Sequence, residues 1–336
     1  MPSFIKTLYK LPKTQKIFYF LLFLLSINII SGLRLTSAAY EGFANEIGAN
    51  EIGANEIGTN EIGANEIGAN DFIVKKGTNL YDNFYVQVYD ELLFSKVKND
   101  FEIGELVKHT TPTNDSLVLD IGSGTGHHVS GLHANGIKAI GIDQSAAMVK
   151  EAKKTYPNFD YRVADALKTE TFPAGTFSHI TCFYFTIYYI ENKRKFFENC
   201  IYWLNSGGYL ILHLVDRNNF DPILPAGDPF KIISPQNYAK KRITSTVVKF
   251  NDFDYKSNFE VFPNDDTAVL NETFKYKNNN KMPGKKMRRN EHNFYMPTQK
   301  NILNMAKEVG FIVLSEVEMT RCQYSNQFIY ILQKPS

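Results

Sequence analysis

The stretch "SLVLDIGSGTGHH" (residues 116–128) joins a short apolar run to a glycine-rich turn. The run "LVLDI" is typical of a buried strand, and residues 127–134 are typical of a helix. Such turns between a strand and a helix usually bind phosphate at the helix N-terminus. Asp120, however, stands at the start of this turn, where its carboxylate would repel a phosphate. We therefore expect a ligand that carries no phosphate there.

Strands and helices alternate along the rest of the chain, which indicates an α/β fold with a doubly wound, mostly parallel sheet. Two helices are predicted within residues 79–110. After the glycine turn, strands are predicted at 137–143, 160–165, 177–185 and 209–215, and helices at 145–154 and 191–204. The segments 308–319 and 327–334 complete a sheet of seven strands, in which the last strand is paired antiparallel.

Three acidic residues stand at or near the ends of successive predicted strands. Asp120 and Asp143 end the first two strands, and Asp165 ends the third. Because the carboxyl ends of parallel strands meet at one edge of the sheet, their side chains should converge on one crevice. A carboxylate after the second strand is suited to ribose hydroxyls, and one after the third to an adenine amino group.

The spacing of the glycines also argues against a dinucleotide. Gly122, Gly124 and Gly126 follow a G-x-G-x-G pattern rather than G-x-G-x-x-G. S-adenosylmethionine has an adenosine but no phosphate, and its methionine end carries an ammonium group beside a cationic sulfur. Asp120 would attract these charges. The sequence therefore predicts S-adenosyl-L-methionine as the cofactor, and we predict no metal site.

The segments "VLDIGSGTG", "GIDQSAAMV" and "VADAL" resemble the three cofactor motifs of class I S-adenosylmethionine-dependent methyltransferases, which have a Rossmann-like fold. The resemblance implies that Asp120 and the glycines hold the methionine moiety, Asp143 the ribose and Asp165 the adenine. The full set of cofactor-binding residues that we predict is Asp120, Gly122, Ser123, Gly124, Gly126, Asp143, Gln144, Asp165, Ala166, Cys182 and Phe183. One departure is Ser178, which stands where the family often has Asp at a structural position.

An insertion at 217–297 separates the fifth strand from the last two. Its alternating segments predict an antiparallel, β-rich lid, with the turn "PNDD" between two of its strands and a further strand at 291–297. Such a lid resembles the small-molecule branch of the family, which includes glycine and amino-sugar N-methyltransferases. The basic run 281–290 lacks interleaved aromatics, so we interpret it as a solvated hairpin tip rather than a nucleic-acid surface.

The sequence does not assign a catalytic residue. Tyr184, Tyr188 and His213 are candidates because they follow or lie within strands that should end at the cofactor. A core position is the alternative for each of them, and we favour it for His213. His128 is expected to pack on its helix rather than to act as a base. Resemblance to the family also suggests that the N-terminal helix covers the site through Tyr81, Tyr85 and Tyr89.

The N-terminal 71 residues differ from the rest in composition. Four lysines precede an apolar run from Ile17 to Ile30, which predicts a membrane anchor or a signal peptide within 1–40. The anchor would place the N-terminus in the cytoplasm and the enzyme across the membrane, whereas cleavage would give a secreted or lumenal protein. Residues 44–68 contain five copies of a tandem pentapeptide repeat, "ANEIG" with one Thr variant, and 41–71 is predicted to be a disordered linker.

The prediction from sequence is thus a methyltransferase domain at 72–336 that methylates an amine or hydroxyl of a small molecule. The alternatives are a membrane-tethered protein or lipid methyltransferase, and a catalytically silent module that binds S-adenosylmethionine. A net charge of +2 gives no general attraction to nucleic acid. The three cysteines suggest a reducing compartment, which conflicts with the predicted topology. The oligomeric state stays open.

Overall fold

The structure is a computed structural model that describes residues 72–223, 236, 239–277 and 287–336. These residues belong to one compact unit, Asn65–Ser336. The predicted anchor at 1–40 and the repeats lie outside the described residues and stay predictions. Within the described part of the chain, no helix is long and apolar enough to cross a membrane.

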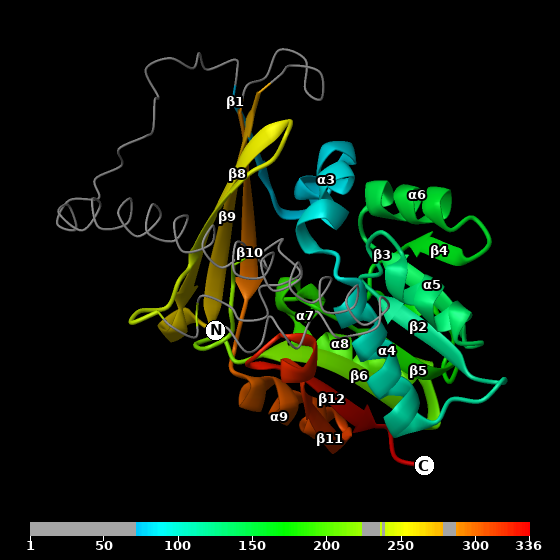
Figure 1. The fold of residues 1–336 in the computed structure, drawn as a ribbon. Helices are drawn as coiled ribbons and strands as arrows, with labels where there is room; N and C mark the ends of the chain where they lie inside the picture. The colour runs from blue at the N-terminus through cyan, green and yellow to red at the C-terminus, as the bar shows by residue number, and fades with distance from the viewer. Residues whose placement is uncertain (1–71, 224–235, 237–238, 278–286) are drawn as a thin grey trace, which may run out of the picture. The chain divides into compact units, whose positions relative to one another are not determined.

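A seven-stranded sheet forms the centre of the unit, with the strand order β11-β12-β6-β5-β2-β3-β4 (Figure 1). Its strands are β2 (Leu117–Ile121), β3 (Lys138–Asp143), β4 (Asp160–Val163), β5 (Phe177–Cys182), β6 (Leu204–Val215), β11 (Ile312–Glu318) and β12 (Gln327–Gln333). All neighbours pair in parallel except β12, which is antiparallel to both β6 and β11. The predicted fold class and the antiparallel last strand are confirmed.

Helices cover this sheet because its central strands β2, β5 and β6 are largely apolar and buried. They are α3 (Asn83–Leu93), α4 (Lys96–Thr110), α5 (His127–Ala134), α6 (Ala146–Thr155), α7 (Thr186–Tyr189), α8 (Lys193–Trp203) and α9 (Gln299–Val309). Ser145 caps α6 as predicted, since its hydroxyl accepts a hydrogen bond from the Met148 amide. The short α7 and the helix α9 were not predicted.

A second sheet of five strands, the insertion sheet, has the order β1-β10-β9-β8-β7. Its strands are β1 (Phe72–Lys76), β7 (Ser245–Lys249), β8 (Phe253–Phe262), β9 (Thr267–Tyr276) and β10 (Met287–Tyr295). The antiparallel hairpin of β8 and β9 confirms the antiparallel strands predicted for the insertion, and its role as a lid stays a prediction. β1 was not predicted, and it adds to β10 in parallel, so the N-terminal segment joins a sheet made largely from the insertion.

The helix α3 packs between the insertion sheet and α6 (Figure 1). Phe84 lies edge-on to Phe274 of β9, with 5.4 Å between ring centroids, and Val88 and Met148 belong to the same apolar cluster. This packing fixes the start of the described chain against both sheets. The tyrosines of α3 are thereby held over the carboxyl ends of the central strands.

The structure describes part of the basic run 281–290 and also the position of Ser178. Arg288 is fully buried in β10, so the interpretation of the basic run as a solvated tip is wrong at this residue. Arg289 is exposed, and Lys281, Lys285 and Lys286 lie outside the described residues. Ser178 has the structural role expected of its position, because its hydroxyl accepts from the Leu117 amide at 3.0 Å and donates to the Leu117 carbonyl at 3.1 Å.

Candidate functional site

The glycine turn after β2 is held in one conformation by its backbone. The amides of Gly122 and Ser123 donate to the Ile142 carbonyl at 2.8 and 3.0 Å, which ties the turn to β3. Gly122 has φ +73°, and a Cβ there would lie 2.4 Å from the Thr186 hydroxyl oxygen. Only glycine fits this position, because both the φ angle and the space exclude a side chain.

The other two glycines of the motif, Gly124 and Gly126, have different structural roles. A Cβ on Gly126 would lie 2.7–2.8 Å from the ring and hydroxyl of Tyr161, whose hydroxyl donates to the Gly126 carbonyl. Gly126 therefore serves packing and does not line the pocket. Gly124 does line it, and a Cβ there would meet only Tyr89, at 3.8 Å. Gly124 is thus the place where a ligand can lie against the backbone.

Asp120 lies at the floor of this pocket and is 2% exposed. Its Oδ1 accepts a hydrogen bond of 2.7 Å from the Thr181 hydroxyl, whereas its buried Oδ2 has no hydrogen-bond partner among the residues that the structure describes. Burial raises the pKa of Asp120 to about 6, against the opposing effect of His128. An unpaired buried carboxylate oxygen is costly, so this position is built for a donor that arrives with a ligand.

The second predicted acid, Asp143, ends β3 beside the same turn. Its Oδ2 accepts from the Gly124 amide at 3.0 Å, and its Oδ1 accepts from the Ser145 amide at 2.8 Å. Burial raises its pKa, and these two bonds oppose the shift. Each carboxylate oxygen keeps a further lone pair, so Asp143 both orders the turn and can accept from a ligand hydroxyl.

The third acid, Asp165, lies two residues beyond β4. Its Oδ1 accepts from the side-chain amide of Gln144 and from the Leu167 amide, both at 2.9 Å. Ala166 is 7% exposed and belongs to the core cluster beside it. The ends of β2, β3 and β4 are neighbours in the sheet and bring the three acids to one edge. Asp120 lines the pocket, whereas Asp143 and Asp165 lie outside its lining, so their predicted contacts with a cofactor stay predictions.

The segment after β5 supplies the opposite wall. Phe183 and Tyr184 line the pocket, and Tyr184 has φ +48°, a conformation that is unusual for a residue with a side chain. The ammonium of Lys98 lies 3.8 Å from the centre of the Tyr184 ring. Cys182, by contrast, is fully buried within the core and does not line the pocket. Its predicted position beside the cofactor is therefore wrong as a lining contact.

Two of the three catalytic candidates lie in the core. Tyr188 is fully buried, and its hydroxyl accepts from the Val215 amide at 2.8 Å. His213 is also fully buried, with Nδ1 3.0 Å from Glu102 and Nε2 3.0 Å from Gln327. Neither residue lines the pocket, so the core alternative holds for both, as the sequence analysis favoured for His213. Of the three candidates, Tyr184 is the one that lines the pocket.

Sequence reasoning missed a buried acid behind the pocket. Glu102 of α4 is fully buried, with Oε2 2.7 Å from Nε2 of His128. Burial opposes its ionisation, but Lys98, His128 and His213 outweigh this and hold the pKa of Glu102 well below its usual value. His128, expected to pack on its helix, thus pairs with Glu102 and also lines the pocket. No local pattern marks Glu102, since its partners come from other elements.

The insertion sheet contributes a second group that was missed. Tyr255, Glu272 and His292 line the pocket from β8, β9 and β10. Nε2 of His292 lies 2.7 Å from Glu272, and the Tyr255 hydroxyl donates to Glu272 at 2.8 Å. The signal for them was alternation, because residues 288, 290, 292 and 294 of β10 are all buried. A polar residue at such a position needs a partner, and the sequence does not show where that partner lies.

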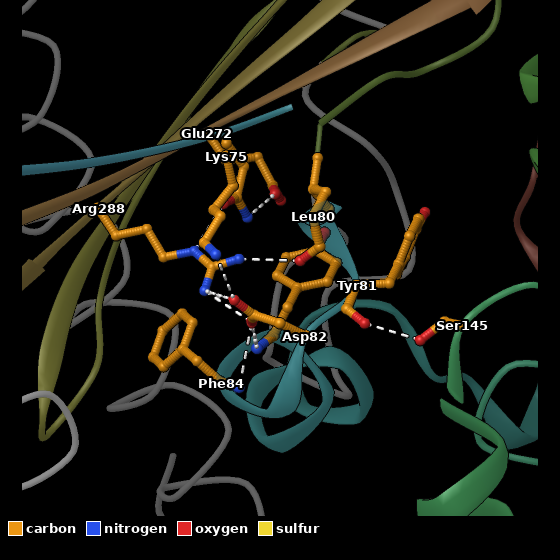
Figure 2. Close-up of polar contacts among 10 residues, drawn as sticks. Lys75, Leu80, Tyr81, Asp82, Phe84, Ser145, Glu272 and Arg288 are labelled. Carbon is orange, nitrogen blue, oxygen red and sulfur yellow. Dashed lines mark hydrogen bonds and ion pairs between the residues drawn. The ribbon is translucent and has the colours of Figure 1, made fainter. Parts of the chain in front are cut away.

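The tyrosines of the N-terminal helix complete the pocket. Tyr81, Tyr85 and Tyr89 line it, as the sequence predicted. The Tyr81 carbonyl accepts from the Ser145 hydroxyl at 2.7 Å, which links this residue to the loop that carries Asp143 (Figure 2). The pocket therefore lies between the glycine turn, the tyrosines, the segment after β5 and the insertion sheet.

Residues 118–208, which contain the glycine turn and the three acids, match the family described as "Methyltransferase domain". This part of the chain is a methyltransferase domain. The match begins in β2 and reaches into β6, so it covers the parallel strands that carry the predicted cofactor site. The insertion sheet lies outside it.

Two curated proteins are similar to the methyltransferase domain. A putative methyltransferase, 235L of Invertebrate iridescent virus 6, is 32% identical over 111 residues, which cover 32% of this chain and 40% of that protein. A putative methyltransferase of Dictyostelium discoideum is 28% identical over 155 residues, covering 44% of this chain and 57% of that protein. The chain thus spans about half the length of these relatives.

Solved structures share the fold of the methyltransferase domain together with its insertion. The CcbJ methyltransferase of Streptomyces caelestis has a TM-score of 0.59 at 13% identity, covering 76% of this chain and 98% of that one. The amino pentose methyltransferase CalS10 of Micromonospora echinaspora, solved with S-adenosylmethionine bound, has a TM-score of 0.52 at 17% identity, covering 77% and 99%. The cofactor of this family is S-adenosylmethionine, and the unpaired Oδ2 of Asp120 and the open face of Gly124 fit it.

Proposed function

We propose that this protein transfers a methyl group from S-adenosylmethionine to an amine or hydroxyl of a small molecule. The observation that carries the proposal is the unpaired, buried Oδ2 of Asp120 in a pocket whose glycine turn is open at Gly124. A carboxylate there attracts an ammonium group and repels a phosphate.

The chain's own residues suffice to hold and orient the cofactor. Asp120 would accept from the ammonium of the methionine end, and the Gly124 backbone would lie against it. Asp143 would accept from ribose hydroxyls through the lone pairs that Gly124 and Ser145 leave free. Asp165 would accept from the adenine amino group. When bound, the cofactor supplies a methyl group on a cationic sulfur, which is already activated for in-line substitution.

Catalysis would then rest on holding the acceptor in line and removing water. Alignment alone can contribute about 7–11 kcal/mol to lowering a barrier. Aromatic rings of Tyr85, Tyr184 and Phe294 line the wall of the pocket, and they would exclude water from the reacting atoms. Burial raises the pKa of Tyr184 well above its usual value, so this residue would act as a neutral hydrogen-bonding group.

A small acceptor is favoured by the insertion sheet, because β8, β9 and β10 all contribute side chains to the pocket wall. Two of the solved structures with a similar fold are a sugar N-methyltransferase of a Streptoalloteichus species and the amino pentose methyltransferase CalS10. A silent binding module is disfavoured because all three cofactor acids are present and converge.

Calorimetry on the full chain tests the proposal. S-adenosylmethionine and S-adenosylhomocysteine should both bind, and NADH should not. Transfer of label from methyl-labelled S-adenosylmethionine to a panel of small amines and alcohols should follow. Binding of NADH without binding of S-adenosylmethionine would overturn the proposal, and cofactor binding without transfer to any acceptor would favour the silent module.

A further inference from the structure

A chain of four side chains leads from the pocket into the insertion sheet. The Tyr81 hydroxyl donates to the Tyr189 hydroxyl at 2.8 Å, which lies 2.6 Å from Nδ1 of His292. Nε2 of His292 lies 2.7 Å from Oε2 of Glu272. Tyr81 and Tyr189 are partly exposed to the pocket, whereas His292 and Glu272 are 2% and 1% exposed. All four residues line the pocket, and the chain is most accessible at its tyrosines and least accessible at His292 and Glu272.

The buried end fixes where the protons lie. Nε of Arg288 donates to Oδ1 of Asn290 at 2.7 Å, so the amide NH2 of Asn290 faces Oε2 of Glu272, at 3.1 Å. Tyr255 donates to the other oxygen of Glu272. Burial raises the pKa of Glu272, but these donors and His292 outweigh it and lower that pKa overall. Glu272 is thus an ionised acceptor surrounded by donors.

An ionised Glu272 sets the direction of the whole chain. Nε2 of His292 must carry the hydrogen that Glu272 accepts, which leaves Nδ1 of the neutral ring as an acceptor. Tyr189 then donates to Nδ1, and Tyr81 donates to Tyr189. Each hydrogen of the chain therefore points along it from Tyr81 towards Glu272. The Tyr81 oxygen keeps lone pairs that can accept a proton from a ligand in the pocket.

We propose that Tyr81, Tyr189, His292 and Glu272 form a proton relay that deprotonates a primary or secondary amine entering the pocket as an ammonium ion. This inference rests on the proposed function. An N–H bond of the ammonium breaks and an O–H bond forms at Tyr81. The former proton of Tyr81 moves to Tyr189, and that of Tyr189 moves to Nδ1 of His292. The electron pair stays on the amine nitrogen and becomes the nucleophile.

The charge is balanced at the end of the relay, because the imidazolium of His292 faces the carboxylate of Glu272. After product release the same steps in reverse return the proton to water. Burial raises the pKa of Tyr81 and of Tyr189 well above the usual value. Neither residue therefore stands as a tyrosinate, and each passes a proton rather than storing a charge.

The relay is suited to an amine and not to an alcohol. An alkyl ammonium has an ordinary pKa of about 10.4, whereas an aliphatic hydroxyl is a far weaker acid that resembles water. Removal of a proton from the ammonium is therefore much the easier of the two. The pocket also favours a cation, since Asp90, Asp120, Asp221 and Glu272 line it, whereas Lys98 is the one lysine or arginine among its described lining residues.

The groups that face His292 come from four elements. Glu272 faces it from β9, Tyr189 from α7, and Tyr85 from α3 with 5.8 Å between ring centroids. Tyr81 lies just before α3, with its ring 6.2 Å away. Arg288 reaches the cluster only through Asn290. The ionisable groups that face His292 are thus one carboxylate and three tyrosines.

Single-turnover rates of the full chain at saturating cofactor, from pH 6 to 10, test the relay. The acceptor probes are glucosamine and ethanolamine, with glucose and ethylene glycol as their hydroxyl counterparts. General-base groups contribute about 10²–10⁴-fold, so His292→Gln and Tyr189→Phe should each lose about 100-fold at pH 7. Their rates should rise with pH towards the wild-type rate as the amine loses its proton unaided. Tyr202→Phe, at an exposed tyrosine of α8, should change nothing.

A loss of rate that is equal at all pH values would show a structural role and overturn the relay. Transfer to the hydroxyl probes in preference to the amines would also overturn it.

A measurement on the resting protein separates failure of the relay from failure of the proposed function. Nitrogen NMR of labelled histidine, assigned with His292→Gln, should show His292 protonated at Nε2 alone. Protonation at Nδ1 would overturn the relay whether or not the protein binds S-adenosylmethionine. Absence of cofactor binding with the expected tautomer would instead overturn the proposed function.

Discussion

Arg288 forms an ion pair with Asp82 in which its Nη1 lies 2.8 Å from Oδ1 and 3.0 Å from Oδ2 of the carboxylate (Figure 2). The guanidinium is fully buried, and it also donates to the Leu80 carbonyl at 2.9 Å. Asp82 at the same time caps α3 by accepting from the amides of Phe84 and Tyr85. The pair therefore fixes the first turn of α3, and with it Tyr81, against the insertion sheet.

Removal of one partner of this pair should destabilise the protein strongly. Arg288→Met leaves the half-buried Asp82 without its main partner, and Asp82→Asn leaves a buried guanidinium uncompensated. Loss of one partner from a buried pair costs about 3–5 kcal/mol. The double variant should lose less than the sum of the two single variants, because neither charge is then left alone. Chemical denaturation of all three proteins measures this, and strict additivity would contradict the coupling.

Cofactor affinity should fall in acid because of Asp120. Its pKa is raised to about 6 by burial, so it is protonated below that pH in the free protein. A cationic ligand needs the ionised form, and affinity should fall towards tenfold per pH unit below pH 6. Asp120→Asn should lower the affinity at pH 7.5 and remove this pH dependence. Asp160→Asn, at an exposed carboxylate, is the control. A wild-type affinity that is constant from pH 5 to 8 would rule out this role.

The same shift predicts the stability of the free protein. A carboxyl whose folded pKa lies above its unfolded value of 3.8 contributes stability below that value and loses it as pH rises through about 6. The loss is about 3 kcal/mol at most, from a shift of about 2 units. Thermal unfolding without ligand should therefore show a smaller decline in stability between pH 4 and 7 in Asp120→Asn than in the wild type. Parallel curves would show that Asp120 titrates normally.

The glycines of the turn should separate binding from stability. Gly126→Ala places a Cβ against the Tyr161 ring at a φ of +92°, so overpacking of about 1–3 kcal/mol adds to backbone strain. Gly124→Ala, at φ +54°, meets only Tyr89 at 3.8 Å and should cost about 1–2 kcal/mol. Its methyl group enters the space where the cofactor backbone would lie, however, so it should lose affinity more than Gly126→Ala does. Denaturation measures the stability of this matched pair, and calorimetry measures its affinity for the cofactor. A larger loss of affinity in Gly126→Ala than in Gly124→Ala would show that the ligand lies elsewhere.

The central sheet was predictable because its signals are local. Each strand is a short apolar run, each helix has its own periodicity, and a single residue such as Ser145 marks a helix start. The acids at the strand ends followed from the same pattern, since parallel strands end at one edge. The core position of His213 was the favoured interpretation, whereas that of Tyr188 was not predictable, because nothing near it in the sequence shows which side of its segment meets the core.

The buried polar residues of the insertion sheet were not predicted, for a different reason. Arg288 pairs with Asp82 206 residues earlier, and Tyr189 joins His292 103 residues later. Alternation in β10 could show that Arg288, Asn290 and His292 point to one side, but a basic run with polar neighbours is usually solvated. That side is buried because it faces α3, the residues just before it and α7, through contacts such as Arg288 with Leu80 and His292 with Tyr189. The partners that make burial of these groups tolerable come from remote parts of the chain.

Asp143 offers the sharpest test of the cofactor's register. Asp143→Ala should weaken binding of S-adenosylmethionine at least about tenfold, since hydrogen bonds to a charged group are worth about 1.5–3 kcal/mol each. Asp143→Asn should be no milder, because its NH2 group must face either the Gly124 or the Ser145 amide, and both of these are donors. Turnover at saturating cofactor should recover in both variants if the carboxylate holds only the ribose.

The control for Asp143 is Asp160→Asn, which lies on β4, the neighbouring strand, with an exposed side chain. Titration of the three variants, followed by single-turnover rates, separates affinity from chemistry. Because Asp143 also orders the turn through Gly124, a loss of turnover that persists at saturation would show that the disturbed turn misplaces the methyl group. Unchanged affinity in Asp143→Ala would instead show that the ribose lies elsewhere, and the assignment of Asp120 and Asp165 to the two ends of the cofactor would fail with it.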